Sequence, residues 1–335
     1  MTPREPAPEQ GAGTPGDTET VRWPLIAKIG VALAVLTVVA GIIAALVAAF
    51  VVDGDDGAER IVTDIAAPVA PVALTDGELL VAERRTGRVL RVTRDGDRSE
   101  VVSVMDDLVT EGQRGLLGLV VRRVGEVTEI YASWTRASDG RLVVGQLVEG
   151  EQMLVWEGPI SADLANGGTL AFRGSELLIG VGELQAPDLV DDPSTPNGKV
   201  LALDPAAAPD QTPTVVAAGL HNPFALDVVG DSVWVVDNAP GSDPERLIRI
   251  TDAGDESSLD LEGTRAPSAL AVLPDGDLAL CGFVSGVVER IPVPETGVRP
   301  PTEEIGPPCA TGVAVLVDGS IVTTTEDAIW RDPNR

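Results

Sequence analysis

Hydrophobic and polar positions alternate along most of this chain, in a pattern that recurs. Each copy consists of an alternating apolar run, an Asp-Gly pair, a second run, a short turn and a third run. Alternation with a period of two is typical of a half-buried strand, and Asp-Gly best supplies the positive φ angles of a tight hairpin. The clearest copies, each predicting a small antiparallel sheet, are Val72–Val92, Leu270–Ile291 and Val313–Arg331.

The spacing of these copies predicts the architecture. Asp275 and Asp318, which mark the turns of two consecutive copies, lie 43 residues apart. Sheet units that recur at about 40 to 50 residues are typical of the blades of a β-propeller. Weaker copies bring the number to six, at Leu116–Val148, Leu170–Leu203 and Ala225–Ile250. We therefore predict an all-β fold, a six-bladed β-propeller.

The ends of the repeat region predict how the ring closes. Ile61–Pro68 precedes the first copy and could supply a missing strand to the last, which would leave no long sheet edge unpaired. The competing interpretation is two all-β domains, which requires a linker near the middle of the chain. The candidate linker is the Pro-rich run Asp204–Thr214, which we interpret as a loop between strands.

A hydrophobic segment precedes the repeats. Ile29–Val52 runs for 24 residues without a charge, enough to span a bilayer as one transmembrane helix. Cations precede it and acids follow it, which predicts a cytoplasmic N-terminus and an extracytoplasmic propeller at the cell membrane. We predict a disordered cytoplasmic leader at 1–24, a transmembrane anchor at 25–52, an acidic linker at 53–60 and the propeller at 61–335. The alternative is a cleaved signal peptide, for which both leader and apolar segment are long.

Charge and cysteine content narrow the function classes. The net charge of −28 leaves no basic surface for phosphates, so nucleic acid is excluded as a partner and anionic lipid is repelled. Cys281 and Cys309 both fall on the exported side, where thiols oxidise. We predict a disulfide between neighbouring blades, which would contribute about 3 to 4 kcal/mol. Two buried unpaired thiols are the alternative.

The common catalytic motifs are missing. One histidine, His221, excludes His-rich metal sites, and two cysteines in this placement do not make a zinc site. Gly180-Val181-Gly182 lacks the third glycine and the following helix of a dinucleotide site. No Gly-rich phosphate loop with a lysine is present.

Four segments, in order and at blade-like spacing, carry a family resemblance. They are Gly112–Val120 (GQRGLLGLV), Asn166–Phe172 (NGGTLAF) with Leu178–Glu183 (LLIGVGE), Asn197–Pro205 (NGKVLALDP) and Gly219–Leu226 (GLHNPFAL). Together they resemble the glucose/sorbosone dehydrogenase family, over roughly Val72–Arg331. The resemblance implies a six-bladed propeller that binds pyrroloquinoline quinone (PQQ), usually with calcium, and oxidises aldoses outside the cytoplasm.

The resemblance also implies roles for single residues. Gln113 and Asn222 match positions that contact the quinone in the family, and we include Asn166 and His221 as candidate cofactor contacts. Two positions depart from the family pattern. The histidine that takes the proton from the sugar is replaced by Ala165, and the arginine that polarises the quinone is replaced by His221. A methyl group cannot act as a base, so we predict that catalysis is lost or much reduced.

Substitutes for the lost groups can be named. His221 and Asp163 are candidate replacement bases, and the alternative for His221 is a structural, hydrogen-bonded histidine. By the resemblance, calcium would be held in the loop Asp237–Glu245, and Asp237, Asp243 and Glu245 supply the hard oxygen ligands that it prefers. An acidic surface loop is the alternative interpretation.

Three functions remain open at this point. The first is a dehydrogenase with a relocated base, acting on a sugar. The second is a non-catalytic propeller of the cell envelope that binds a ligand or a protein. The third is a calcium-dependent, lactonase-like hydrolase, which requires acids such as Glu183 and Asp237 near the propeller axis.

Overall fold

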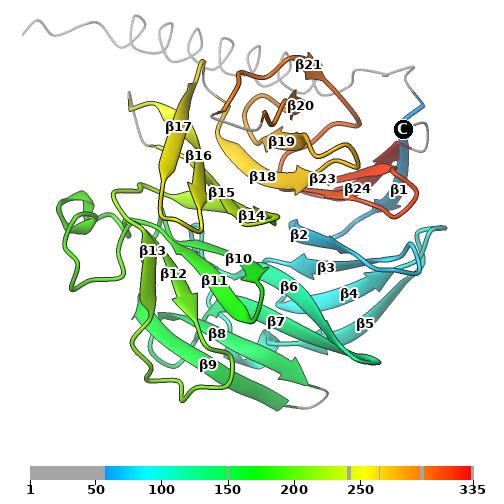
Figure 1. The fold of residues 1–335 in the computed structure, drawn as a ribbon. Coiled ribbons are helices and arrows are strands. Elements are labelled where there is room, and N and C mark those ends of the chain that lie inside the picture. The colour runs from blue at the N-terminus through cyan, green and yellow to red at the C-terminus, as the bar shows by residue number, and fades with distance from the viewer. Residues whose placement is uncertain (1–56, 149–150, 240–242, 264, 295–297, 333–335) are drawn as a thin grey trace, which may run out of the picture. The chain divides into compact units, whose positions relative to one another are not determined.

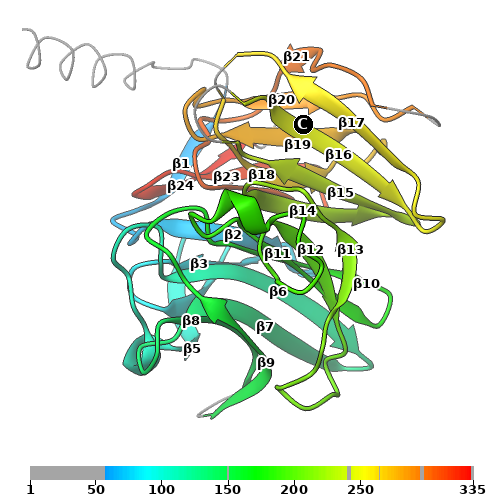
Figure 2. The same ribbon diagram turned by 90° about the vertical axis from the view of Figure 1, so that its left-hand side faces the viewer.

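The computed structural model describes residues 57–148, 151–239, 243–263, 265–294 and 298–332. Within these residues, six four-stranded antiparallel sheets are arranged as blades around a central axis (Figure 1 and, from the side, Figure 2). The prediction of an all-β, six-bladed propeller is therefore confirmed. Two short 3₁₀ helices, η1 (Met105–Asp107) and η2 (Pro187–Leu189), lie in loops.

Each blade places one strand at the axis and three progressively further out. The innermost strands are β2 (Pro68–Ala73), β6 (Leu116–Val124), β10 (Gly167–Arg173), β14 (Pro223–Val229), β18 (Pro267–Val272) and β22 (Gly312–Val315). The second strands are β3 (Leu79–Glu83), β7 (Val127–Thr135), β11 (Glu176–Val181), β15 (Ser232–Asp237), β19 (Leu278–Gly282) and β23 (Ile321–Thr324).

The third strands are β4 (Arg88–Val92), β8 (Arg141–Val148), β12 (Lys199–Leu203), β16 (Glu245–Thr251), β20 (Val288–Ile291) and β24 (Ala328–Asp332). The outermost strands are β5 (Arg98–Ser103), β9 (Glu151–Ile160), β13 (Thr214–Ala217), β17 (Glu256–Leu261), β21 (Glu303–Glu304) and β1 (Glu59–Thr63). The alternating repeats seen in the sequence correspond to the inner three strands of each blade.

The Asp-Gly pairs lie between the first and second strands, as expected, but the turns are longer than a two-residue hairpin. In the first blade the loop covers residues 74–78, and only its glycine has a positive φ, of 82° at Gly77. Asp76 instead accepts a hydrogen bond from the backbone N–H of Glu78 at 3.1 Å. The glycine therefore supplies the left-handed conformation and the aspartate fixes the loop through its side chain.

The ring closes through the N-terminal strand. β1 pairs antiparallel with β24 of the last blade, with Thr63 opposite Ala328. The predicted closure is confirmed, although the strand ends at Thr63 and Pro68 already begins the first blade. Residues 204–213 join β12 to β13 within one blade, so the Pro-rich run is a loop and the two-domain alternative is wrong.

The hydrophobic core is divided among the spaces between blades. Each of its six clusters of buried residues is built mainly from two neighbouring sheets. Trp134 packs between the first and second blades and Trp234 between the fourth and fifth, both fully buried. Each interface therefore depends on residues from both of the blades that it joins.

The cysteines form the predicted disulfide. Cys281 lies in β19 of the fifth blade and Cys309 shortly before β22 of the sixth, with their Cα atoms 5.7 Å apart. Both residues are buried. The bond therefore links the two blades next to the point of ring closure.

The predicted leader and anchor, and the first half of the predicted linker, lie outside the described residues. Among the residues that are described, no helix is long and apolar enough to cross a bilayer. Residues 55–335 form one compact unit that contains every strand of the six blades. A fragment with these bounds therefore retains the complete ring.

Candidate functional site

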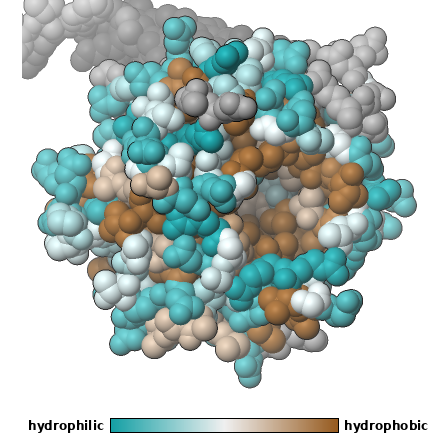
Figure 3. Space-filling model, in the orientation of Figure 1, coloured by the Kyte–Doolittle hydropathy of each residue, from teal (hydrophilic) through white to brown (hydrophobic). Residues whose placement is uncertain are grey.

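A cavity of about 660 Å³ lies at the centre of the ring. All six innermost strands contribute to its wall, and most of the lining side chains are apolar. Figure 3 shows the corresponding hollow with hydrophobic walls. This volume falls in the range of about 300 to 1,000 Å³ that is usual for small-molecule sites.

One end of the cavity carries its polar rim. Loops that precede the innermost strands and loops that follow the second strands meet at the same end of an antiparallel blade. The lining residues from these loops include Arg84, Gln113, Asn238, Thr311 and Glu326. We call this end of the cavity its mouth. The sequence motifs that contain Gln113, Asn166 and Asn222 lie at this end.

Gln113, Asp163 and Ala165 are brought together at the mouth. The Gln113 Oε1 accepts a hydrogen bond from the N–H of Ala165 at 2.9 Å, and its own N–H donates to the Asp163 carbonyl at 2.8 Å. Of the three, Gln113 lines the cavity. The Asp163 carboxylate is 73% exposed and pairs with Arg114 at 2.9 Å. Asp163 therefore does not point a free carboxylate into the cavity.

Asn166 and Asn222 hold the loops together. Asn166 is 2% exposed, and its amide both accepts from the N–H and donates to the carbonyl of Ala162. The Asn222 Oδ1 accepts from the N–H of Gly167 at 3.0 Å, across the boundary between the third and fourth blades. Neither residue lines the cavity. The structure thus gives both asparagines a structural role at the predicted cofactor positions.

His221 lies between two carboxylates. Its Nδ1 is 2.9 Å from Oε2 of Glu183, and its Nε2 is 3.7 Å from Oδ2 of Asp243. None of the three residues lines the cavity. The imidazole is therefore held by hydrogen bonding outside the central pocket, which matches the structural interpretation of this histidine.

The proposed calcium ligands are already occupied. The buried Asp237 accepts the N–H groups of His221 and Asn222 through Oδ1, and Oδ2 accepts from Arg246 at 2.6 Å. Both carboxylate oxygens of Glu245 accept backbone N–H groups, at 3.0 and 2.8 Å. Within the described part of the chain, no three His, Cys, Asp or Glu side chains gather as a metal site.

These contacts do not fit a calcium ion. A metal would have to displace the backbone amides and Arg246, and Asp237 and Asp243 do not approach each other as a ligand set. Glu183 and Asp237 also lie outside the cavity lining, so neither of the acids named for the lactonase-like hydrolase lies at the axis.

Comparison with known proteins identifies the ancestry of this arrangement. The family profile described as Glucose / Sorbosone dehydrogenase matches residues 65–243, more than half of the chain. The chain belongs to the glucose/sorbosone dehydrogenase family. The matched range contains the four recognised segments, so the resemblance seen in the sequence is confirmed.

Solved structures share the propeller. The PQQ-bound aldose sugar dehydrogenase from Streptomyces coelicolor has a TM-score of 0.68 at 21% identity, over 82% of this chain and 96% of that one. The soluble aldose sugar dehydrogenase from Escherichia coli, in its apo-form, has a TM-score of 0.68 at 18% identity, over 82% of this chain and 98% of that one. At such identities these structures show the fold. A comparison with curated proteins finds no match.

In this member of the glucose/sorbosone dehydrogenase family, Ala165 is a non-glycine residue with a strained backbone. Ala165 has a φ of 56°, in the left-handed region, where histidine and asparagine are more readily accommodated than alanine. Its carbonyl lies 2.0 Å from where a Cβ on Gly182 would stand, so the loop leaves no room for movement there. The backbone at Ala165 is thus held in a left-handed conformation within a tightly packed loop.

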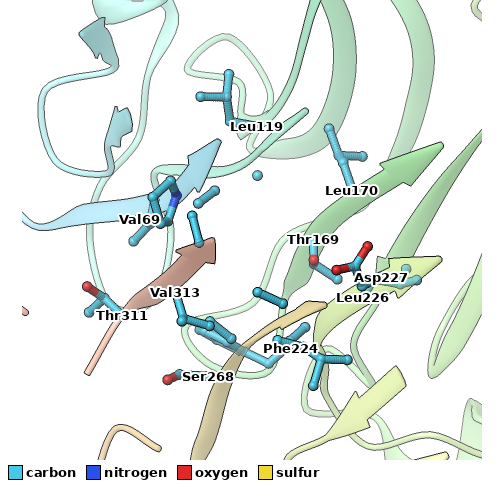
Figure 4. Close-up of a pocket in the computed structure, with 18 of the residues that line it drawn as sticks. Val69, Leu119, Thr169, Leu170, Phe224, Leu226, Asp227, Ser268, Thr311 and Val313 are labelled. Atoms are coloured by element: carbon cyan, nitrogen blue, oxygen red, sulfur yellow. The ribbon is translucent and has the colours of Figure 1, made fainter. Parts of the chain in front are cut away.

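The cavity of this family member also contains an acid that the sequence analysis missed. Asp227 lies on β14 among apolar lining residues, near Thr169 on the neighbouring strand β10 (Figure 4). Burial raises its pKa to about 6, against the lowering effect of hydrogen bonds from the N–H groups of Val228 and Val272. A single aspartate inside the apolar strand PFALDVV was the available signal.

Asp227→Asn should stabilise the propeller at alkaline pH. The carboxyl has its ordinary pKa of 3.8 when unfolded and about 6 when folded, so the stability that it contributes is complete below 3.8 and lost as pH rises through 6. The amide keeps an acceptor oxygen but cannot ionise. We expect the free energy of unfolding to rise by about 3 kcal/mol at pH 8 and by only about 1 kcal/mol at pH 4.5, measured by urea unfolding.

The matched control for this variant is Asp95→Asn, because Asp95 is exposed. It should leave the free energy of unfolding unchanged at both pH values. If Asp227→Asn raised the free energy of unfolding equally at both pH values, the carboxyl would not be held neutral by its surroundings.

Proposed function

We propose that this protein is a glucose/sorbosone dehydrogenase family propeller that has lost, or greatly reduced, its sugar-oxidising activity and acts by binding a ligand or protein of the cell envelope. The observation that carries the proposal is Ala165 at the position where the family resemblance places the catalytic base. General-base assistance commonly contributes a factor of about 10² to 10⁴ in rate, and a methyl group contributes none.

Neither of the two candidate replacement bases, His221 and Asp163, is placed to act on a sugar in the cavity. The His221 ring nitrogens face Glu183 and Asp243, and Asp163 pairs with Arg114. A base must lie within hydrogen-bond reach of the proton that it removes. Since none of these side chains lines the cavity, a sugar bound there would not meet them.

The charges at the cavity also disagree with the family's cofactor. PQQ carries three carboxylates, which require cations close by. Among the described lining residues Arg84 is the one cation, whereas Asp227 and Glu326 are acidic. Arg84 already donates to the carbonyls of Gly112 and Arg114. The residues present therefore do not fit a tricarboxylate quinone, and we derive no reaction step through it.

The proposed location is the outer face of the cell membrane. The uncharged segment Ile29–Val52 and the charge asymmetry around it support an uncleaved anchor with the N-terminus in the cytoplasm. The disulfide between Cys281 and Cys309 supports an oxidising compartment for the propeller.

The loss of activity can be tested with the fragment 55–335. Supplied with PQQ, calcium, glucose and a redox dye, it should leave the dye unreduced, and titration with PQQ should show no saturable change in the cofactor's absorbance. Dye reduction by the wild-type fragment would overturn the proposal.

Ala165→His is the sharper variant for the same assay. Its left-handed backbone accommodates histidine, so the fold should be kept. We expect no turnover, because the substitution restores a base but adds no cation for the carboxylates of PQQ. Turnover by this variant would show that the cofactor site is intact and that only the base was lost.

A further inference from the structure

Asp227 has no cationic partner. Among the described residues no ion pair involves this carboxyl, which accepts hydrogen bonds from two backbone N–H groups. Arg84 and Glu326, the other charged residues of the cavity wall, lie at the mouth and attract each other. Asp227 is therefore the uncompensated charge of an apolar cavity. Such a charge is costly unless a ligand or another group pairs with it.

The hydrogen-bonding capacity of Asp227 is not exhausted. An ionised carboxylate has about four acceptor positions, and the two backbone N–H groups use two of them. Figure 4 shows the carboxyl group beside the cavity, with Thr169 and Phe224 nearby. A donor entering from the mouth could therefore bond to the carboxylate without displacing a protein contact.

The walls select for an apolar molecule. Side chains such as Val69, Leu119, Leu226 and Val313 surround the space, and Phe283 lines the cavity while remaining 46% exposed. An exposed aromatic ring that also forms part of the wall offers an apolar entry surface. Burial of hydrocarbon in such a cavity is favourable in proportion to the area removed from water.

We infer that the central cavity binds a hydrophobic amine, with its ammonium group on the Asp227 carboxylate and its apolar part against the inner strands. Electrostatic attraction from the protein as a whole, with its net charge of −28, favours a cation over an anion of the same size. The inference rests on the proposed binding function and names the chemical class of its ligand.

Three fluorescent probes that share one ring system test the inference. Dansylcadaverine carries a primary amine, dansylamide is neutral and dansylglycine carries a carboxylate. We expect saturable binding of the amine to the fragment 55–335 at pH 7.5, weaker binding of the neutral probe and none of the anion. Asp227→Asn should lower the affinity for the amine probe by about 10- to 100-fold and leave the affinity for the neutral probe unchanged.

Two controls separate a specific site from general attraction. Glu304→Gln removes one exposed negative charge from the outermost strand β21 and should not alter binding of the amine. Lowering the pH to 5 should reduce the affinity of the wild-type protein for the amine probe toward that of Asp227→Asn. Equal binding of all three probes, no binding of the amine, or equal effects of the two substitutions would overturn the inference. Dye reduction with PQQ would instead overturn the proposed loss of catalysis.

Discussion

Asp237→Ala should lower the free energy of unfolding by about 3 to 5 kcal/mol. The Asp237 side chain is fully buried and accepts the backbone N–H groups of His221 and Asn222. It also pairs with Arg246, whose side chain is 25% exposed. Alanine would leave one buried and one partly buried backbone donor unsatisfied, and a partly buried guanidinium without its counter-ion. Loss of one partner of a buried ion pair is strongly destabilising.

Two further substitutions test which interaction of Asp237 accounts for the lost stability. Asp237→Asn keeps an acceptor oxygen for the backbone N–H groups and removes only the charge, so its loss should be clearly smaller. Asp243→Ala removes an acid from the adjoining loop, 58% exposed, and should change stability by less than about 0.5 kcal/mol. A loss below about 1 kcal/mol for Asp237→Ala would show that the loop does not depend on this carboxylate.

The same measurement distinguishes a structural carboxylate from a calcium ligand. A bound ion stabilises the native state in proportion to the logarithm of its concentration above Kd. Because the oxygens of Asp237 and Glu245 already accept hydrogen bonds, unfolding of the wild-type fragment should be the same in calcium and in a chelator. A rise in the free energy of unfolding with calcium would instead support the predicted metal site.

The architecture could be predicted because several local signals agree. Alternating apolar positions, Asp-Gly loops and a spacing of 43 residues all indicate the same sheet unit. Six such units and one additional N-terminal strand can avoid long unpaired edges by closing into a ring. The detail that failed was the turn geometry. A five-residue loop and a two-residue hairpin share the Asp-Gly signal, and only the backbone shows which one forms.

The sequence placed the candidate residues at the mouth of the cavity, but it did not show which side chains line the cavity. Motif residues such as Asn166 and Asn222 proved to bond to loop backbone, and a sequence does not show whether an amide faces its own loop or a cavity. Asp227 was missed for the opposite reason. One polar residue in a strand looks like an outward-facing position, and only the ring geometry shows that the innermost strand has no solvent face beyond the cavity.

Removing the disulfide by Cys281→Ala together with Cys309→Ala should cost about 3 to 4 kcal/mol of unfolding free energy. The bond joins residues 28 positions apart, so its loss gives the unfolded chain the freedom of a loop of that length. The position adds a second consequence. The sixth blade depends on pairing between β1 and β24, strands from opposite ends of the sequence, and the disulfide ties this blade to the fifth on its other side.

The design of the disulfide experiment follows from ring closure. Each single alanine variant should lose about as much stability as the double variant, because either one breaks the bond, and a reductant should destabilise only the wild-type fragment. If the bond limits opening at the closure, protection of β1 and β24 amides from hydrogen exchange should fall before that of β6 or β10. A double variant as stable as the wild type, with unchanged exchange at β1, would mean that strand pairing alone holds the ring closed.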